Sequence, residues 1–149
     1  MKLANPYLNF AGQTLEAFTF YKSVFGTEFA GPALRFRDFG ENMMNIAEGE
    51  MDLIAHVTLP IGGGNLLMGS DVPSNQPSLN VGNNVYIMLE AESAEEADRV
   101  FDALAQGGTV EMPLSKTEWA EKYGVCKDKF GIQWMMNFTG SVTWEDPKP

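Results

Sequence analysis

Apolar residues recur at helical spacing in two separate segments of the chain. From residue 14 to 25 they return every three or four positions, which predicts an amphipathic helix, and Gly26 follows as a C-cap. The same spacing returns after Ser93, where Glu96 completes a capping box and Gly107 ends the segment. The apolar stripes of the two predicted helices are Leu15, Phe18, Tyr21 and Phe25, and Ala97, Val100, Phe101 and Leu104.

Each predicted helix is preceded by one strand and followed by three. Residues 28–39 form a half-buried strand in this interpretation, because Leu34 and Phe36 alternate with two arginines. Pro6 places the first strand at a sheet edge or at its own start. The predicted strands are 2–10, 28–39, 51–60 and 66–68 in the first half, and 84–91, 109–114, 124–128 and 132–138 in the second.

This repeated order predicts an α+β fold made of two βαβββ modules. We expect the first module over residues 1–70, a linker rich in Ser, Pro and Asn over 71–83, the second module over 84–139, and a tail over 140–149. A four-stranded sheet with one helix leaves its other face uncovered. Facing two such concave faces together, within one chain or between chains, would cover them.

Composition narrows the possible partners and the compartment. The 149 residues carry a net charge of −10, so nucleic acid and anionic membrane surfaces are not expected as partners. The single cysteine, Cys126, cannot form an internal disulfide, which favours a reducing, cytoplasmic setting. The first residues do not have the pattern of a signal peptide, and no stretch reaches the roughly 18 apolar residues of a membrane helix.

Several motifs resemble those of the glyoxalase, bleomycin-resistance and extradiol-dioxygenase proteins, the vicinal oxygen chelate superfamily, and within it the PhnB-like branch. The resemblance rests on PYLNFAGQTLEAFTFYKSVFG at 6–26, HVTL at 56–59 with IGG at 61–63, Trp119 with Tyr123-Gly124, and DKFGIQW at 128–134. It implies paired βαβββ modules with curved mixed sheets and the helices outside. It also implies a homodimer with sites in the concavities of the sheets.

Metal-using members of this superfamily carry His, Gln or Glu early in the first strand and midway along the last strand of each module. The resemblance projects these positions onto Pro6, Met68, Tyr86 and Met135. None of these residues or their neighbours is a histidine or a carboxylate, and Glu90 is the one acidic candidate on these strands. We therefore expect no metal and no cofactor, which argues against glyoxalase I, thiol-transferase and dioxygenase activity.

Some members of the branch are described as methyltransferases. The sequence has no strand followed by a glycine-rich turn and a helix that would bind a nucleotide-like cofactor. We therefore do not adopt that activity as an expectation.

His56 is the candidate catalytic residue. A histidine titrates near neutral pH and can serve as acid, base or hydrogen-bond donor to a ligand. The alternative is a strand histidine that only bonds a neighbour. Methionine and aromatic side chains on the predicted strands suit an adaptable apolar pocket, and Met43 and Met44 are placed to cover something apolar. The candidate ligand-binding residues are His56, Met68, Tyr86, Trp119, Tyr123 and Met135.

Three functions remain open from these residues. The first is a metal-free protein that binds a small organic molecule in an apolar concavity. The second is an enzyme of the same superfamily, a lyase, transferase or isomerase acting on a small electrophile, with His56 as acid or base and with or without a recruited divalent metal. The third is a fold retained for binding another protein.

Overall fold

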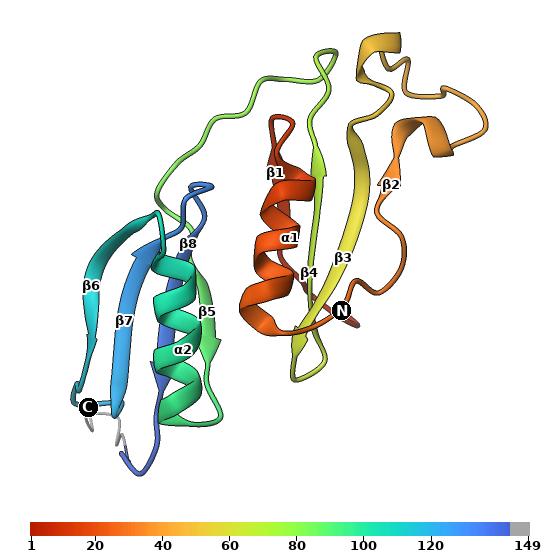
Figure 1. Ribbon diagram of the computed structural model, residues 1–149. Coiled ribbons are helices and arrows are strands. Elements are labelled where there is room, and N and C mark those ends of the chain that lie inside the picture. The colour runs from red at the N-terminus through yellow and green to blue at the C-terminus, as the bar shows by residue number, and fades with distance from the viewer. Residues whose placement is uncertain (144–149) are drawn as a thin grey trace. The chain divides into compact units, whose positions relative to one another are not determined.

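The computed structural model describes residues 1–143, and its internal contacts divide the chain into two compact units, Met1–Asn80 and a second unit that begins at Val81. Each unit holds one α-helix and a four-stranded sheet in the order strand, helix, strand, strand, strand (Figure 1). The predicted pair of βαβββ modules is therefore confirmed. The predicted linker, 71–83, spans the division between the units.

The first unit contains a mixed sheet with strand order β1-β4-β3-β2. Strand β1 runs parallel to β4, and the other neighbours are antiparallel. β1 begins directly after Pro6 and lies at the sheet edge, where a missing N–H costs no ladder hydrogen bond. Its elements are β1 (Tyr7–Phe10), α1 (Thr14–Phe25), β2 (Leu34–Arg35), the 3₁₀ turns η1 (Phe36–Asp38) and η2 (Glu48–Glu50), β3 (Ile54–Gly62) and β4 (Asn65–Asp71).

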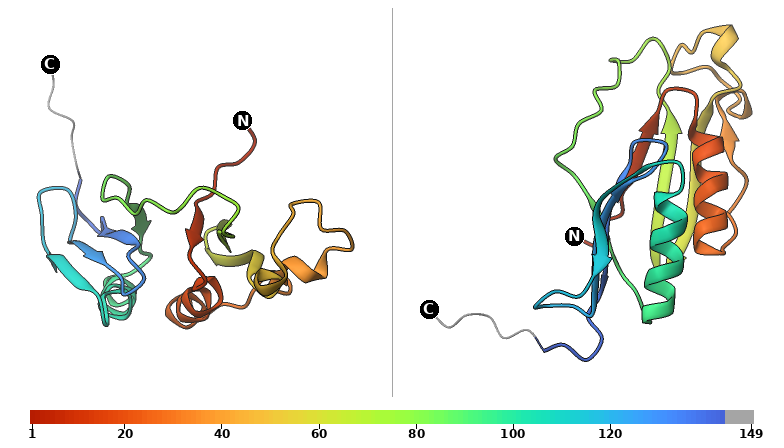
Figure 2. Two further views of the ribbon diagram at one scale, coloured as in Figure 1. Left: turned by 90° about the horizontal axis from the view of Figure 1, so that it is seen from above. Right: turned by 60° about the vertical axis from the view of Figure 1, so that its left-hand side comes forward.

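Helix α1 lies across one face of this sheet (Figure 2). Gly69 on β4 permits this packing, because a Cβ there would lie 2.6 Å from Phe18 Cε2 and 2.9 Å from the Leu8 carbonyl oxygen. Gly26 ends the helix in the left-handed conformation, with φ of 65°, as predicted. Leu15, by contrast, is exposed and does not belong to the buried stripe.

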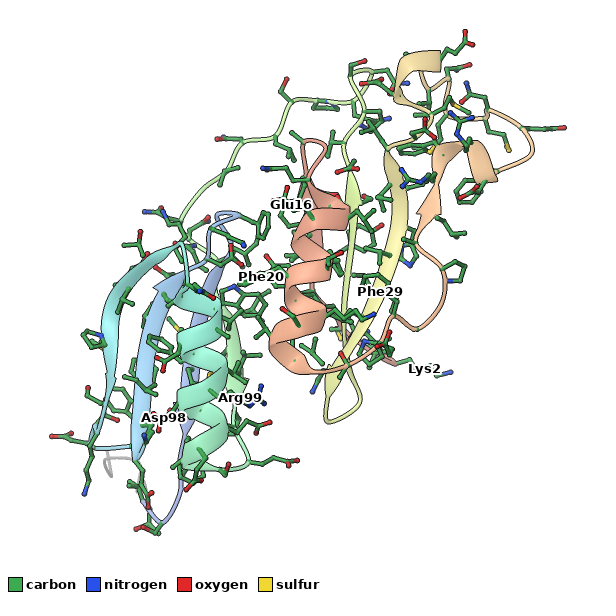
Figure 3. The ribbon with its side chains drawn as sticks, in the orientation of Figure 1. Lys2, Glu16, Phe20, Phe29, Asp98 and Arg99 are labelled. Carbon is green, nitrogen blue, oxygen red and sulfur yellow. The ribbon has the colours of Figure 1, made fainter. Side chains whose placement is uncertain are left out.

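The end of α1 is fastened to the segment that leads toward β2. Lys22 Nζ lies 2.5 Å from Glu28 Oε2 and 5.6 Å from the centroid of the Phe29 ring, which is labelled in Figure 3. The Thr27 hydroxyl donates to the carbonyl of Pro60 on β3 at 2.6 Å.

The predicted strand 28–39 is wrong over most of its length. Only Leu34 and Arg35 pair with β3, and the chain then turns into η1. Local hydrogen bonding favours that turn, since the Asp38 carboxylate accepts the Arg35 N–H at 2.7 Å. Phe36 is nevertheless buried, so the alternation correctly identified the core residue but not the backbone conformation.

The second unit repeats the arrangement with strand order β5-β8-β7-β6, and β5 is parallel to β8. Helix α2 buries the four predicted stripe residues. Ser93 Oγ accepts the Glu96 N–H at 3.1 Å, while the Glu96 side chain accepts from Glu92 instead of returning to Ser93 as in a full capping box. The elements are β5 (Ile87–Glu90), α2 (Ala94–Ala105), β6 (Thr109–Ser115), β7 (Lys122–Lys127) and β8 (Gln133–Phe138).

The turn between β7 and β8 is organised by a buried carboxylate. Asp128 Oδ1 accepts the N–H groups of Phe130 and Ile132, and Oδ2 accepts Trp134 Nε1–H at 2.8 Å. Asp98 of α2, which is labelled in Figure 3, accepts from Lys122 of β7 at 2.5 Å. Within residues 1–143, neither helix has the length and hydropathy needed to cross a membrane.

Candidate functional site

The candidate site lies on the face of the first sheet that is turned away from α1. Tyr7 pairs with Met68, and Met68 pairs on its other side with Thr58, so these three side chains share one face. Gly69, the next residue on β4, faces the helix. His56 is two residues before Thr58 on β3 and therefore joins the open face.

Tyr7, His56 and Thr58 form a continuous hydrogen-bonded chain on this face. The Tyr7 hydroxyl lies 3.1 Å from His56 Nδ1, and His56 Nε2 lies 2.9 Å from Thr58 Oγ1. The two rings are 5.7 Å apart between centroids and tilted by 31°. His56 is half-buried and Tyr7 is 44% exposed, so the tyrosine is the end of the chain that solvent or a ligand meets.

A cavity of about 990 Å³ opens beside Tyr7. Its floor is formed by the strands β1 and β4, and its walls by the segments 36–46 and 72–79. All of its lining belongs to the first unit: Tyr7, Asn9, Phe36, Phe39, Gly40, Glu41, Asn42, Met43, Met44, Ile46, Ala55, Ser70, Asp71, Val72, Pro73, Gln76, Pro77 and Leu79.

The walls of the cavity are mainly apolar, with Glu41, Asn42 and Gln76 as their polar residues, and its floor is polar. Asn9 and Ser70 are register partners, and Ser70 Oγ lies 3.2 Å from Asn9 Oδ1. Within residues 1–143, the charged residues of the lining are Glu41 and Asp71, and no Lys, Arg or His lines the cavity. Asp71 is 4% exposed and both its oxygens accept hydrogen bonds from the protein.

The methionine-bearing wall is held in place by asparagines. Asn42 Nδ2 donates to the Ile46 carbonyl, and Asn42 Oδ1 accepts the Ile46 N–H, both at 2.8 Å. Asn75 Nδ2 donates to the carbonyls of Met44 and Asn45, at 2.7 and 3.1 Å. The wall is thus tied both to itself and to the segment after β4. Met43 and Met44 line the cavity but are exposed, at 84% and 52%.

Two of the sequence-derived site residues lie in this unit. Neither His56 nor Met68 lines the cavity, but both share its open face, and His56 contacts it through Tyr7. Tyr7 itself was not singled out as a site residue, and neither was Asn9. Their positions at i and i+2 on the first strand place them on one face, but only the pairing with β4 shows which face is open.

The remaining predicted residues lie on or near the second sheet. The Tyr86 hydroxyl donates to Glu111 Oε2 at 2.9 Å, and this hydrogen bond, with burial, raises the pKa of Tyr86. Trp119 and Tyr123 meet edge to face, with centroids 5.3 Å apart and planes at 74°. Met135 pairs with Met88 on β5 and with Val125 on β7.

Glu90 and Asn137 form a further polar group on this sheet. Asn137 Nδ2 donates to Glu90 Oε2 at 2.5 Å, and the Thr139 N–H donates to Glu90 Oε1 at 2.9 Å. Burial alone would raise the pKa of Glu90, but these hydrogen bonds outweigh it, so the pKa lies below its ordinary value.

The superfamily's metal positions do not fit a metal in this chain. The resemblance projected these positions onto Pro6, Met68, Tyr86 and Met135, whereas the strand pairing brings Tyr7 opposite Met68 and Met88 opposite Met135. A phenol and three thioethers do not supply the oxygen and nitrogen ligands that Mg²⁺, Mn²⁺ or Zn²⁺ prefer. Over residues 1–143, no three side chains of His, Cys, Asp or Glu gather closely enough to hold an ion.

The sequence profile of a family described as 3-demethylubiquinone-9 3-methyltransferase matches residues 2–137 of the chain. The chain belongs to this PhnB-like family. Protein YjdN of Escherichia coli K12 is 32% identical over 139 residues, which cover 89% of this chain and 92% of YjdN.

Solved structures show the same relationship. Protein PA1353 of Pseudomonas aeruginosa is 37% identical, with a TM-score of 0.81 over 93% of this chain and 98% of the other. A putative 3-demethylubiquinone-9 3-methyltransferase, PhnB protein, of Bacillus cereus is 29% identical, with a TM-score of 0.72 over 93% and 99% of the two chains.

The fold extends to more distant proteins of the vicinal oxygen chelate superfamily. The fosfomycin resistance protein FosX of Listeria monocytogenes is 12% identical, with a TM-score of 0.61 over 94% of each chain. At that identity the likeness concerns the fold alone. It confirms the α+β architecture of open, mixed four-stranded sheets.

Proposed function

We propose that this PhnB-like protein binds a small organic molecule, without a metal, in the cavity on the open face of its first sheet. The observation that carries the proposal is the cavity itself, with its mainly apolar walls and the uncharged polar pair Asn9 and Ser70 on its floor. We further propose that the protein works in the cytoplasm as a homodimer.

The dimensions and chemistry of the cavity support binding of a small molecule. Its volume of about 990 Å³ falls within the range of roughly 300–1,000 Å³ that is usual for ligand pockets. Such pockets are mainly apolar with a few polar groups that orient the ligand, as the floor residues Asn9 and Ser70 would do here. Methionine walls adapt to ligands of different outline, because the thioether chain is flexible and polarisable.

A second candidate function is favoured by the contact between His56 and Tyr7. In an enzyme acting on a small electrophile, as a lyase, transferase or isomerase, His56 would serve as acid or base through the Tyr7 hydroxyl that lines the cavity. We do not extend the methyltransferase activity in the family's description to this chain. The strands that lead into α1 and α2 are not joined to them by a glycine-rich turn of the kind that cradles a nucleotide-like cofactor.

The test uses the neutral dye N-phenyl-1-naphthylamine, whose fluorescence rises in apolar pockets. We expect saturable binding to the intact protein. Met44→Glu, which puts a charge in the cavity wall, should weaken binding by about tenfold or more, which is about 1.4 kcal/mol. Met88→Glu is the matched control, because Met88 is similarly exposed, at 59% against 52%, but lies on β5 of the second unit.

Absence of dye binding to the intact protein would overturn the proposal. Loss of binding in Met88→Glu with normal binding in Met44→Glu would move the site to the second sheet, where Tyr86, Trp119, Tyr123 and Met135 were predicted to bind ligand.

A further inference from the structure

We infer that Tyr7, oriented by His56, selects the ligand by its polar head. The cavity takes an apolar molecule whose head is a hydrogen-bond donor, uncharged or cationic, and it rejects anions. The inference rests on the proposed function and adds the chemical class of the ligand. Two independent observations carry it: the hydrogen-bond distances that join Tyr7, His56 and Thr58, and the sign of the charges that line the cavity.

The hydrogen-bond chain has a preferred direction. A neutral imidazole carries one N–H and one bare nitrogen, so only one of its two hydroxyl neighbours can donate to it. A phenol, with a pKa of about 10, is a far stronger acid than the aliphatic hydroxyl of threonine, so it is the better donor to the bare nitrogen. Tyr7 therefore donates to His56 Nδ1, and His56 Nε2–H donates to Thr58 Oγ1.

This direction determines what Tyr7 offers to a ligand. Its only proton is engaged with His56, so the hydroxyl oxygen presents lone pairs to the cavity that Tyr7 lines. A ligand N–H or O–H can donate to that oxygen. A ligand carbonyl or ether placed there would face another acceptor and would lose the hydrogen bond that it made in water, at a cost of about 1–3 kcal/mol.

The charges of the lining favour the same ligands. Glu41 and Asp71 are the charged residues of the lining, and both are acidic. Asp71 cannot take the head directly, because its oxygens already accept from Gly12, Thr14 and Ile54. Its charge nonetheless acts on whatever enters. An anionic head would face the Glu41 carboxylate, with the buried Asp71 charge behind the floor on the helix side, and within residues 1–143 no cationic side chain lines the cavity. A neutral or cationic donor meets no repulsion there.

Three dyes of one skeleton test the inference on the intact protein. N-phenyl-1-naphthylamine carries a donor N–H, its N-methyl derivative lacks that proton, and 8-anilinonaphthalene-1-sulfonate adds a negative charge. We expect the N–H dye to bind about threefold to tenfold more tightly than the N-methyl dye, which is the worth of one neutral hydrogen bond. The sulfonate should bind at least about tenfold more weakly than the N–H dye, because no cation of the lining can pair with it.

Substitutions show which residues cause the preference for the N–H dye over the N-methyl dye. Tyr7→Phe should bind the N–H and N-methyl dyes alike. His56→Leu should reduce the preference, because the released Tyr7 hydroxyl is no longer held with its oxygen lone pairs toward the cavity. His56→Asn, whose amide oxygen can accept the tyrosine proton in place of Nδ1, should keep the preference. The readout is the dissociation constant of the N-methyl dye divided by that of the N–H dye. If His56 had only a structural role, its substitution could lower the melting temperature but would leave this ratio unchanged.

The possible outcomes separate the two proposals. Equal binding of the N–H and N-methyl dyes by the intact protein, a preference that survives Tyr7→Phe, or preferred binding of the sulfonate overturns this inference. The proposed function stands in each of those cases, because dye binding itself supports it. If none of the dyes binds, the proposed function fails and this inference fails with it.

Discussion

Thr14 Oγ1 donates a hydrogen bond of 2.6 Å to Asp71 Oδ1, joining the first residue of α1 to the last residue of β4. The same oxygen accepts the N–H groups of Gly12 and Thr14, each at 3.0 Å, and Oδ2 accepts the Ile54 N–H at 2.8 Å. One buried carboxylate thus satisfies the start of the helix and the start of β3. It also fixes the end of β4, one of the two strands that form the floor of the cavity.

Replacing Asp71 should destabilise the protein strongly. In Asp71→Asn, one oxygen becomes an NH₂ group that faces a backbone N–H, and the charge that strengthens the remaining hydrogen bonds is lost. We expect the free energy of unfolding in urea, followed by far-UV circular dichroism, to fall by about 3 kcal/mol.

The control is Asp52→Asn, which breaks the ion pair with Arg37. Because both side chains of that pair are more than half exposed, we expect a loss of at most about 1 kcal/mol. Equal losses in the two variants would contradict the role given to Asp71.

Asn75 should affect how tightly the cavity binds a ligand. Asn75→Ala removes two hydrogen bonds to the carbonyls of Met44 and Asn45, so the methionine wall must be ordered when the ligand binds. We expect the dissociation constant of N-phenyl-1-naphthylamine to rise about threefold to tenfold, the equivalent of about 0.5–1.5 kcal/mol. Asn80→Ala is the control, because Asn80 is exposed and does not line the cavity. An unchanged affinity in Asn75→Ala would show that the wall does not depend on this contact.

Cys126 should be unreactive in the folded protein. Burial, reinforced by the charges of Asp128 and Glu111, raises the pKa of its thiol from 9.0 to about 11. Iodoacetamide at pH 8 should therefore alkylate Cys126 in urea but scarcely in buffer. Rapid alkylation of the native protein would contradict the buried position on β7.

The raised pKa also predicts how stability changes with pH. The folded state holds the thiol proton more tightly than the unfolded state does. The stability linked to this proton is full below pH 9 and is lost as the pH rises through 11. The difference in unfolding free energy between the protein and Cys126→Ala should shrink by roughly 2–3 kcal/mol over that window.

The sequence predicted the elements whose bounds are determined by residues close together in the chain. Helix α1 begins and ends where apolar spacing and Gly26 placed it, and α2 buries the four residues of its predicted stripe. Of the predicted strand 28–39, only Leu34 and Arg35 formed strand β2, because the chain then turns into η1, where Asp38 accepts the Arg35 N–H, and periodicity does not register such a turn. Segment 72–79 was interpreted as linker from its Ser, Pro and Asn content, although five of its residues form part of the cavity wall.

The site was predictable only in part. The sequence singled out His56 because it is the one histidine of the chain. Its partner Tyr7 is 49 positions away and becomes its neighbour only because β1 and β3 both pair with β4. Asn9 and Ser70 meet for the same reason, 61 positions apart. Composition alone does not mark such residues as binding groups.

By itself the sequence determined the paired βαβββ modules, because hydrophobic periodicity and glycine caps act over a few residues and recur in both halves. It also determined that the superfamily's metal positions carry no suitable ligands, since residue identity decides that chemistry directly. Only the tertiary structure decided where a cavity opens. A cavity depends on which strands pair, which face the helix covers and which loop folds over the other face. Those are contacts between residues far apart in the chain.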